Sequence, residues 1–485
     1  MDVLFLYDDA PVMPPLIRQI INVDRFSAIV RRKRRLGDII AAAVEGIEHV
    51  RFVPVAARGN VSDLEVLERL PAGTMVLRLP SCIAPGDITG FQQLVRKLPY
   101  APGTTLLGRF EDEAVALLDL ADTAALLKIT EPRERRSFFG QIAERAVQID
   151  NVAGFTDLRD VNGFLGFMTG ATEVRHFNAM QSLAGIYRKS SADMAKMRAE
   201  YRFFHVVPEN LKRFLLPTFN YQEHGGTASY EMEKLSVPDA ALQIVHQSFT
   251  PAGFGKLLDS FFDFVATRER RSVGVAAARD VAREEIAGKV DRRLAQLMAN
   301  PIGQEVDQLL RAAGPMGGIA DLQARCQAII RRAIDRDPTD HLCVSHGDPC
   351  LSNILFNGDL GLFRLIDPRG AETLDGTLMH PLYDVAKFSH SVLGGYDFIN
   401  NGLFECRLDA NNRLTLELDG NGPPRWMRDA FAERVKQAGF DMRAVRAVEL
   451  SLFMSMLPLH IDVPRKLPAF ALTASAIISE LETDR

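Results

Sequence analysis

The sequence lacks an apolar run long enough to cross a membrane, and it has few cysteines. Residues 1–9 hold a five-residue apolar run followed directly by two acids, which is typical of neither a signal peptide nor a spanning helix. The five cysteines are an odd number without paired spacing, and no Cys-x-x-Cys or His/Cys cluster suggests zinc. These absences predict reduced thiols, no transmembrane segment and a cytoplasmic protein.

The chain also lacks an excess of positive charge. Its 485 residues are 47% hydrophobic and 25% charged with a net charge of -5, which indicates a folded protein of two or three domains. A nucleic-acid partner is not expected, because phosphate contacts need a basic face. One basic run, at residues 31–35, falls in an expected helix at 28–44. It is read as a solvated helix face or as a surface for a phosphate or an anionic membrane.

The first 150 residues lack a phosphate-binding glycine fingerprint, and Asp8-Asp9 is not the Asp-x-Asp spacing of a metal-dependent transferase. Catalytic chemistry is therefore unsupported here, and a degenerate nucleotidyltransferase-like domain used for binding or oligomerisation is as good a reading as an active one. The alternation of apolar runs and helical stretches predicts an α/β layer with a mostly parallel sheet. Strands are expected at 3–7, 50–55, 74–79 and 104–107, with helices such as 62–69 and 88–98 between them.

Beyond this part the pattern changes twice. A strand ending near residue 191, a helix at 192–205, a polar hairpin and a strand at 228–235 fit a small mixed lobe. From residue 239 the sequence is largely helical. Helices are expected at 251–268, 276–298, 319–333, 383–393, 426–438 and 444–456, with a polar hairpin around 408–418.

Acids at fixed spacing stand inside the helical part. Asp348 follows His346-Gly, Asn353 comes five residues later, and Asp367-Pro-Arg-Gly comes nineteen residues after Asp348. A carboxylate that accepts a hydroxyl proton, with an amide and a second carboxylate that hold magnesium, is the minimum apparatus for phosphoryl transfer. The alternative is that these residues only cap turns before apolar strands.

An upstream pair adds to this pattern. Lys189 ends an apolar strand, and Glu200 lies eleven residues later on the expected helix. This spacing suits a lysine that reaches nucleotide phosphates and a glutamate that fixes it. An ordinary surface lysine is the alternative, and Arg188 is the functional residue if the register is off by one.

With these residues in place, positions 160–485 resemble the aminoglycoside phosphotransferase/choline kinase family, whose fold is that of protein kinases, and most of all the phosphotransferases found with bacterial capsular-polysaccharide genes. The supporting segments are residues 346–355, 365–370, 381–390 and 457–464. The resemblance implies an α+β protein-kinase-like two-lobe phosphotransferase with an additional N-terminal α/β domain. The expected domains are 1–155, a kinase-like N-lobe at 156–238 and a helical C-lobe with the catalytic loop at 239–485.

The resemblance also implies roles on the donor side. Lys189 and Glu200 would serve the phosphates of ATP or GTP, and Asn353 and Asp367 would ligate Mg²⁺. The purine would meet the chain near Met232, Glu233 and Leu235. The phosphate-covering loop, at 174–182, departs from the family pattern because it has no glycine fingerprint.

On the acceptor side the resemblance makes Asp348 the catalytic base. His346 would support the loop by hydrogen bonding, with a general-base role as the alternative. Asp384 would brace the loop from a helix. Arg369 stands where the family usually has an aromatic residue or glycine; it would contact a phosphate or an acidic substrate, or pair with Glu372.

The expected function is therefore Mg²⁺-dependent transfer of a nucleoside triphosphate γ-phosphate to a hydroxyl of a small molecule, such as a sugar or glycan precursor for capsular polysaccharide. Two alternatives stay open. One is a kinase-like binding or scaffolding protein without turnover, and the other is a bifunctional enzyme whose first domain is a working nucleotidyltransferase. Protein phosphorylation is less favoured, because no activation segment with a phosphosite is legible between Asp367 and Asp384.

Overall fold

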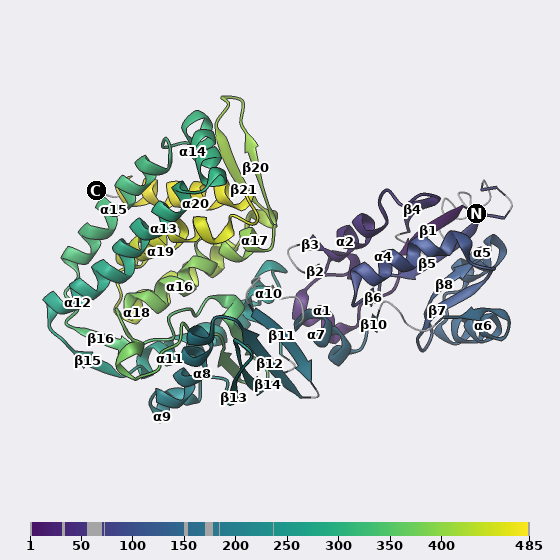
Figure 1. Cartoon of the computed structure of the whole chain (residues 1–485), viewed down its shortest axis with the longest axis horizontal. Helices are drawn as coiled ribbons and strands as arrows, with labels where there is room; N and C mark the ends of the chain where they lie inside the picture. Colours follow the sequence, from purple (N-terminus) through teal and green to yellow (C-terminus); the bar gives the residue numbers. More distant parts are fainter. Residues whose placement is uncertain are drawn as a thin grey trace. The chain divides into compact units, whose positions relative to one another are not determined.

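The computed structural model describes residues 2–31, 34–55, 70–71, 73–149, 154–169, 178–183, 185–235 and 237–483. The chain forms two compact units, Met1–Thr172 and Glu173–Arg485 (Figure 1). This division comes later than the expected boundary at residue 155, so that strand β10 (Phe155–Asp157) and helix α7 (Val161–Thr169) belong to the first unit.

A six-stranded sheet forms the centre of the first unit. Its order is β4 (Val50–Val55), β1 (Val3–Asp8), β5 (Met75–Pro80), β8 (Ala114–Leu118), β7 (Thr105–Arg109) and β9 (Val147–Gln148). Of the five pairings three are parallel, and β8 runs antiparallel to both of its neighbours. The expected α/β layer is thus confirmed, with a mixed sheet because of the unanticipated strand β8. Every residue of β1 is buried, as is typical of a strand covered on both faces.

Helices and two short strand pairs complete this unit. The helices are α1 (Pro15–Ile21), α2 (Leu36–Val44), α4 (Ile88–Lys97), α5 (Leu120–Lys128), α6 (Pro132–Arg145) and α7, and β2 (Val30–Arg31) pairs with β3 (Arg34–Arg35) as β6 (Ile83–Pro85) pairs with β10. The helix expected at 62–69 lies outside the described residues.

The reading of 28–44 as one helix with a basic solvated face is wrong. Only α2 is α-helical, because β2 and β3 pair just before it. Arg31 is buried, donates to the Phe167 carbonyl (3.2 Å) and lies over the ring of that residue. Arg34 and Arg35 are exposed.

A chain of buried charges ties the strands of the first unit together. Asp8 at the end of β1 accepts from Arg78 of β5 at 2.5 and 3.0 Å, and the same guanidinium donates to Glu113 at 2.7 Å. Glu113 also contacts the buried Arg135 of α6. Because a desolvated charge is tolerated only when it is paired, each member depends on the others.

The second unit begins with an antiparallel sheet of order β11 (Asn178–Leu183), β12 (Ile186–Ser191), β14 (Thr227–Glu233) and β13 (Thr218–His224). Helix α8 (Met194–Val206) lies on this sheet and buries Met197 against Tyr230 and Met232 of β14. The short helix α9 (Glu209–Lys212) follows α8. This arrangement confirms the small mixed lobe that the sequence predicts.

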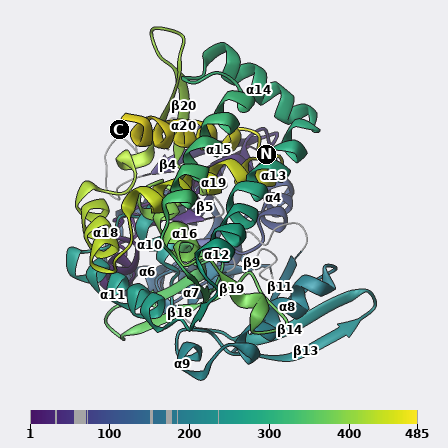
Figure 2. The ribbon, with the colours of Figure 1, turned by 90° about the vertical axis from the view of Figure 1, so that its left-hand side faces the viewer.

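The rest of the second unit is mostly helical, as expected (Figure 2). Its helices are α10 (Ala240–Val245), α11 (Pro251–Thr267), α12 (Val275–Ala282), the π-helix η3 (Arg283–Gly288), α13 (Lys289–Met298), α14 (Pro301–Ala313), α15 (Ile319–Arg336), α16 (Leu382–Val392), α17 (Tyr396–Asn400), α18 (Arg425–Gln437), α19 (Met442–Met456) and α20 (Lys466–Thr483). Helix α19, buried from Ala444 to Met456, packs against α13, α15, α16 and α20. Within the described ranges, no helix has the length and apolarity to span a membrane.

Short strands frame the candidate site of this unit. β15 (Arg270–Ser272), β16 (His341–Val344) and β19 (Leu378–Met379) form one sheet, and β17 (Ile354–Asn357) pairs with β18 (Leu362–Leu365). The polar hairpin expected near 408–418 is β20 (Phe404–Leu408) with β21 (Leu414–Leu418).

We expect Arg78→Met to destabilise the first unit by about 3–5 kcal/mol, because it leaves Asp8 and Glu113 buried without their shared cation. The single tryptophan, Trp426, belongs to the second unit, so its fluorescence does not follow this change. Amide hydrogen exchange in β1 and β5 is the measurement. Arg136→Met, which removes an exposed arginine paired with Glu111, is the matched control. Unchanged exchange in Arg78→Met would show that the buried charges do not support the sheet.

Candidate functional site

Asp384 of α16 holds the backbone of the loop that follows β16. Its two carboxylate oxygens accept from the amides of His346 (3.1 Å) and Gly347 (2.8 Å). The buried Arg268 donates to the same carboxylate at 3.1 Å and to the Pro381 carbonyl. A buried carboxylate with these donors is fully paired, so the loop is fixed where the brace was expected.

Gly347 allows the loop to turn beside the segment around Arg369. Its φ is 80°, a left-handed conformation that favours glycine, and a Cβ there would lie 2.7 Å from the Cβ of Arg369. The Arg369 amide donates to the His346 carbonyl at 2.9 Å. The two polar segments found in the sequence are therefore brought side by side.

The imidazole of His346 supports this loop from inside. Burial lowers the pKa of His346, so the ring is neutral near pH 7. Its Nδ1 accepts from the Asp348 amide at 3.3 Å, and its ring meets Phe203 of α8 edge-on. Since Nδ1 is engaged by the backbone, the geometry favours the supporting role over that of a general base.

The carboxylate of Asp348 meets a cation that the sequence analysis did not single out. Lys387 Nζ lies 2.9 Å from Asp348 Oδ1. The Asp348 carbonyl accepts from the side-chain amide of Asn353 at 2.9 Å, which orients Asn353 within the same loop. Asn353 ends the short 3-10 helix η4 (Leu351–Asn353), and Asp348 and Asn353 are thus neighbours as their spacing predicts.

Lys189 bridges two carboxylates. Its Nζ donates to Glu200 Oε2 at 2.7 Å and to Asp367 Oδ1 at 3.0 Å. Although burial lowers the pKa of Lys189, the two carboxylates raise it above its ordinary value, so the ammonium stays charged. Arg188 points elsewhere and pairs with Glu231. The geometry therefore decides between the two neighbouring residues: Lys189, and not Arg188, faces Glu200.

The segment from Asp367 to Ala371 docks on α8. Asp367 has a φ of 55°, which is uncommon for a residue with a Cβ and is found mainly where surrounding contacts enforce it. A Cβ on Gly370 would lie 2.7 Å from the Glu200 amide nitrogen, so only glycine permits this approach. The Ala371 amide donates to the Ala199 carbonyl at 3.0 Å. These contacts hold Asp367 beside Lys189.

The expected purine-contacting residues lie at the end of β14. Met232 is buried in the cluster with Met197 and Tyr230, Leu235 packs against it, and Glu233 is exposed. In the part of the chain that the structure describes, no hydrogen bond or ion pair joins their side chains to the acids of the site. Of the loop expected to cover the phosphates, residues 174–177 lie outside the described ranges.

Arg369 pairs with a different acid from the expected one. Its Nη1 lies 3.6 Å from Glu285 Oε1, in the π-helix η3. Glu372 instead lies 4.0 Å from Arg198, so the proposed pair with Glu372 is wrong. The guanidinium of Arg369 is half exposed and remains accessible to a ligand.

Sequence reasoning missed three residues of this site: Arg268, Lys387 and Tyr230. Tyr230 donates to Glu200 at 3.1 Å, and burial raises the pKa of its phenol. The sequence did contain a signal for Lys387, because it follows Asp384 by three residues and therefore shares its helix face. Arg268 had none, because it stands 116 residues from its partner.

Asn353 and Asp367 offer side-chain oxygens of the kind that magnesium prefers. The amide nitrogen of Asn353 is used by the backbone, which leaves its carbonyl oxygen, and Asp367 supplies a carboxylate that is one-third exposed. Mg²⁺ takes one or two carboxylates and completes its shell with phosphates and water. Among the described residues no group of three His, Cys, Asp or Glu could hold a metal, so any ion here depends on such further ligands.

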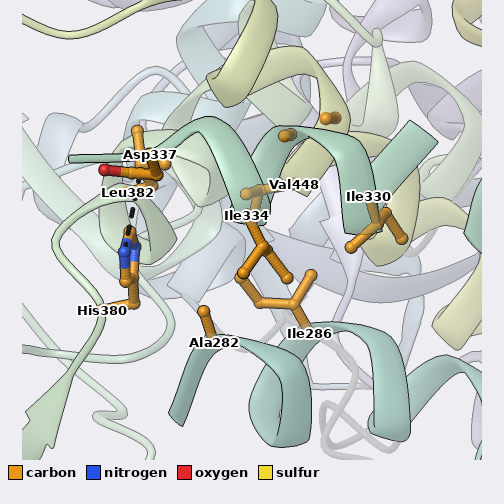
Figure 3. A pocket seen from close by; sticks show the side chains of 10 residues that line it. Ala282, Ile286, Ile330, Ile334, Asp337, His380, Leu382 and Val448 are labelled. Atoms are coloured by element: carbon orange, nitrogen blue, oxygen red, sulfur yellow. Dashed lines mark ion pairs between the residues drawn. The ribbon is translucent and has the colours of Figure 1, made fainter. Parts of the chain in front are cut away.

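A separate small cavity lies behind the π-helix (Figure 3). Its wall is mostly aliphatic, with Ile286, Ile330, Ile334 and Val448 among the lining residues. At one end His380 lies 3.6 Å from Asp337. None of the candidate catalytic residues lines this cavity, so it is not the candidate site.

Comparison with solved structures finds small-molecule kinases: aminoglycoside phosphotransferases and a choline kinase. No protein-family model and no curated protein matches the chain.

Three likenesses illustrate the range. Aminoglycoside phosphotransferase APH(4)-Ia is 11% identical with a TM-score of 0.37, over 63% of this chain and 93% of that one. Choline kinase from Cryptosporidium parvum Iowa II is 11% identical with a TM-score of 0.32, over 67% and 96%. Aminoglycoside-3'-phosphotransferase of type VIII is 14% identical with a TM-score of 0.30, over 58% and 96%. At TM-scores below 0.5, these likenesses carry no conclusion about the activity of this chain.

A buried acid lies behind the candidate loop. Ser391 of α16 accepts from the Leu351 amide at 3.3 Å, and Asp397 of α17 is fully buried nearby. Burial raises the pKa of Asp397 to about 6. Burial likewise raises the pKa of Asp239 to about 7, although Asp239 caps α10 by accepting from the Leu242 amide.

These shifts give a pH dependence of stability. The unfolded carboxyl titrates near pH 4, so between about pH 4 and 6 the folded state binds a proton at Asp397 that the unfolded state does not. Stability from this group is therefore present at low pH and is lost as the pH rises through 6. We expect the free energy of unfolding of Asp397→Asn, taken relative to that of the parent, to rise by about 2–3 kcal/mol between pH 4 and pH 8.

Urea unfolding followed by Trp426 fluorescence measures this difference at each pH. Asp429→Asn, at an exposed position of α18, is the control and should keep the parent's pH profile. If Asp397→Asn also keeps it, Asp397 is ionised in the folded state across this range and the pKa assignment is wrong.

Proposed function

We propose that the second unit transfers the γ-phosphate of a nucleoside triphosphate, ATP or GTP, to a hydroxyl of a small molecule. The observation that carries this proposal is the Lys189 bridge, which joins Glu200 to Asp367 although Lys189 and Asp367 stand 178 residues apart. A lysine with a purely structural role would not need Asp367, the acid that follows the loop of Asp348 and Asn353. Phosphoryl transfer needs all of these groups in one place.

On the donor side, Lys189 would contact the nucleotide phosphates with a charge that Glu200 and Tyr230 hold in place. The purine would lie near Met232, Glu233 and Leu235, at the end of the strand that pairs with β12. Asn353 and Asp367 would hold Mg²⁺, which supplies charge neutralisation on the phosphate oxygens when bound. Each of these residues then acts by positioning, which is the main task of the protein in this chemistry.

On the acceptor side, Asp348 would orient the attacking hydroxyl. A sugar or alcohol hydroxyl titrates far above pH 7, so the carboxylate mainly aligns it and accepts its proton late in a loose transition state. His346 would keep the loop in shape through Nδ1, and Asp384 with Arg268 would fix the loop backbone. The acceptor proposed is a sugar or glycan precursor for surface polysaccharide, as the resemblance of residues 160–485 implies.

The first unit adds no second activity to this proposal. Asp8 and Glu113 are in buried ion pairs with Arg78, and Asp9 accepts from the amide of Ser27 at 3.3 Å. Acids engaged in this way favour a structural role over that of a nucleotidyltransferase site. A kinase-like binding protein without turnover remains the rival for the second unit.

We expect Asp348→Asn to lower kcat by about 10²–10⁴-fold, because it removes the carboxylate that accepts the proton. Calorimetric binding of Mg²⁺-nucleotide should persist, since the donor residues are intact. Product formation is followed by mass spectrometry with a panel of sugars and alcohols and both nucleotides. Asp359→Asn, an exposed acid in the turn between β17 and β18, is the control. Wild-type turnover in Asp348→Asn would show that the base is assigned wrongly. If the parent binds Mg²⁺-nucleotide but turns over no compound, the rival reading of a binding or scaffolding protein is favoured.

We expect Lys189→Met to weaken nucleotide binding and turnover together, because the phosphates lose a charged partner and Glu200 and Asp367 lose the cation between them. A loss of about tenfold or more in nucleotide affinity corresponds to one charged hydrogen bond. Lys196→Met is a close control, since Lys196 lies 3.5 Å from the other oxygen of Glu200 but is exposed. Equal effects in the two variants would mean that Lys189 only neutralises Glu200.

A further inference from the structure

Beside the carboxylate of Asp348 the structure places a ring of charged and polar side chains. We propose that this ring binds an anionic group of the phosphate acceptor, a carboxylate or a phosphate, so that the substrate is an acidic sugar or polyol. The inference rests on the proposed function, because it names the acceptor class of the same site. Its members come from α16, η3, α13 and the segment after Asp367; they are Lys387, Tyr383, Lys289, Glu285 and Arg369.

The first link of the ring is Lys387, whose Nζ lies 2.9 Å from Asp348 Oδ1. Lys387 and Tyr383 are four residues apart on α16 and therefore share one face of that helix. Tyr383 accepts through its hydroxyl from Lys289 Nζ at 2.7 Å. A second lysine is thus held by the phenol that lies one helical turn from Lys387.

The ring continues through the π-helix. Lys289 is the first residue of α13 and follows Glu285 by four residues, so the two side chains lie on the same side of the helix. Glu285 Oε1 lies 3.6 Å from Arg369 Nη1, and the Arg369 amide donates to the His346 carbonyl two residues before Asp348. The contacts therefore return to the loop from which they started.

The charges of this ring do not cancel. Three cations, Lys387, Lys289 and Arg369, face the two carboxylates of Asp348 and Glu285. In the described part of the chain no carboxylate lies within ion-pair distance of Lys289 Nζ, which donates to the phenol of Tyr383 and interacts with the charge of Glu285 from further away. The ring therefore holds one cation more than it has carboxylates, and an anionic ligand would supply the missing charge.

Glu285 points to the rest of the ligand. Its Oε2 is buried and has no hydrogen-bond partner among the described residues. Burial raises the pKa of this carboxyl, although Arg369, Lys289 and a backbone hydrogen bond from His380 act to lower it. An acceptor hydroxyl that donates to Oε2 would satisfy it. The residue also stands in a six-residue π-helical turn, a rare conformation that is frequent at functional sites. An anionic group for Lys289 and a hydroxyl for Glu285 together describe an acidic sugar or polyol.

The first test compares matched acceptors with the full chain, Mg²⁺ and ATP or GTP. The set is glucose as the neutral parent, glucuronate as the carboxylate, glucose 6-phosphate as the phosphate and glucosamine as the cation. We expect at least one anionic member to exceed glucose in kcat/KM by about tenfold, the value of one charged hydrogen bond, and the better anion identifies the group. Equal or higher kcat/KM with glucose or glucosamine would overturn the inference and leave the proposed function intact.

Binding is measured as well, in case no member of this set is turned over. The full chain with Mg²⁺ and a non-hydrolysable ATP analogue is titrated calorimetrically with the same four compounds. Tighter binding of glucuronate or glucose 6-phosphate than of glucose supports the anionic site, and no such difference overturns it. Binding of the Mg²⁺-nucleotide analogue is measured first, in a titration without the four compounds. Failure of the chain to bind it there would contradict the proposed function itself.

The second test changes the ring. In Lys289→Met the preference for the anionic compound over glucose should fall about tenfold, in kcat/KM or in affinity. Lys289→Arg should retain most of it. Arg292→Met is the matched control, because Arg292 lies on the same helix, is exposed and pairs with Glu284. An unchanged preference in Lys289→Met, or an equal loss in Arg292→Met, would overturn the assignment of the ring.

Discussion

The contact on which the second unit depends is the buried ammonium of Lys189 between Glu200 and Asp367. A charge with so little exposure must have partners on every side, so three segments have to meet there. The register of β12 aims Lys189 inward, α8 presents Glu200, and the segment at Asp367 takes a left-handed conformation to reach them. The small sheet and the helical part are joined by this requirement.

Asp384 applies the same principle to the candidate base. Its carboxylate is buried, and it is satisfied by Arg268 together with the amides of His346 and Gly347. A rearrangement of the loop would leave this charge unpaired, which costs several kcal/mol. The positions of Asp348 and Asp367 are therefore set by two different buried ion pairs. Asp348 is held through the backbone of its loop, whereas Asp367 is held by the contact of its own carboxylate with Lys189.

The sequence predicts what is local and what is periodic. The spacing of Asp348 and Asn353, the eleven residues from Lys189 to Glu200 and the buried strand β1 all follow from nearby residues, and the structure agrees. Tertiary partners are not predictable in this way. Arg268 finds Asp384 across 116 residues, and the burial of Arg31 under Phe167 depends on a segment 136 residues away. Helical spacing at 28–44 was misleading because strand pairing of β2 with β3 overrode it.

Charge is distributed differently on the two sides of the proposed site. On the donor side Lys189 is balanced within the protein by two carboxylates, so an incoming nucleotide meets groups that are already oriented. On the acceptor side, among the described residues, Lys289 donates to a phenol, and Arg369 and Lys289 share the single carboxylate of Glu285. Helix α16 carries both Asp384, which fixes the loop, and Lys387, which touches Asp348. An acceptor anion bound at this helix would therefore be placed by the same element that places the base, which couples recognition of the acceptor to alignment of its hydroxyl.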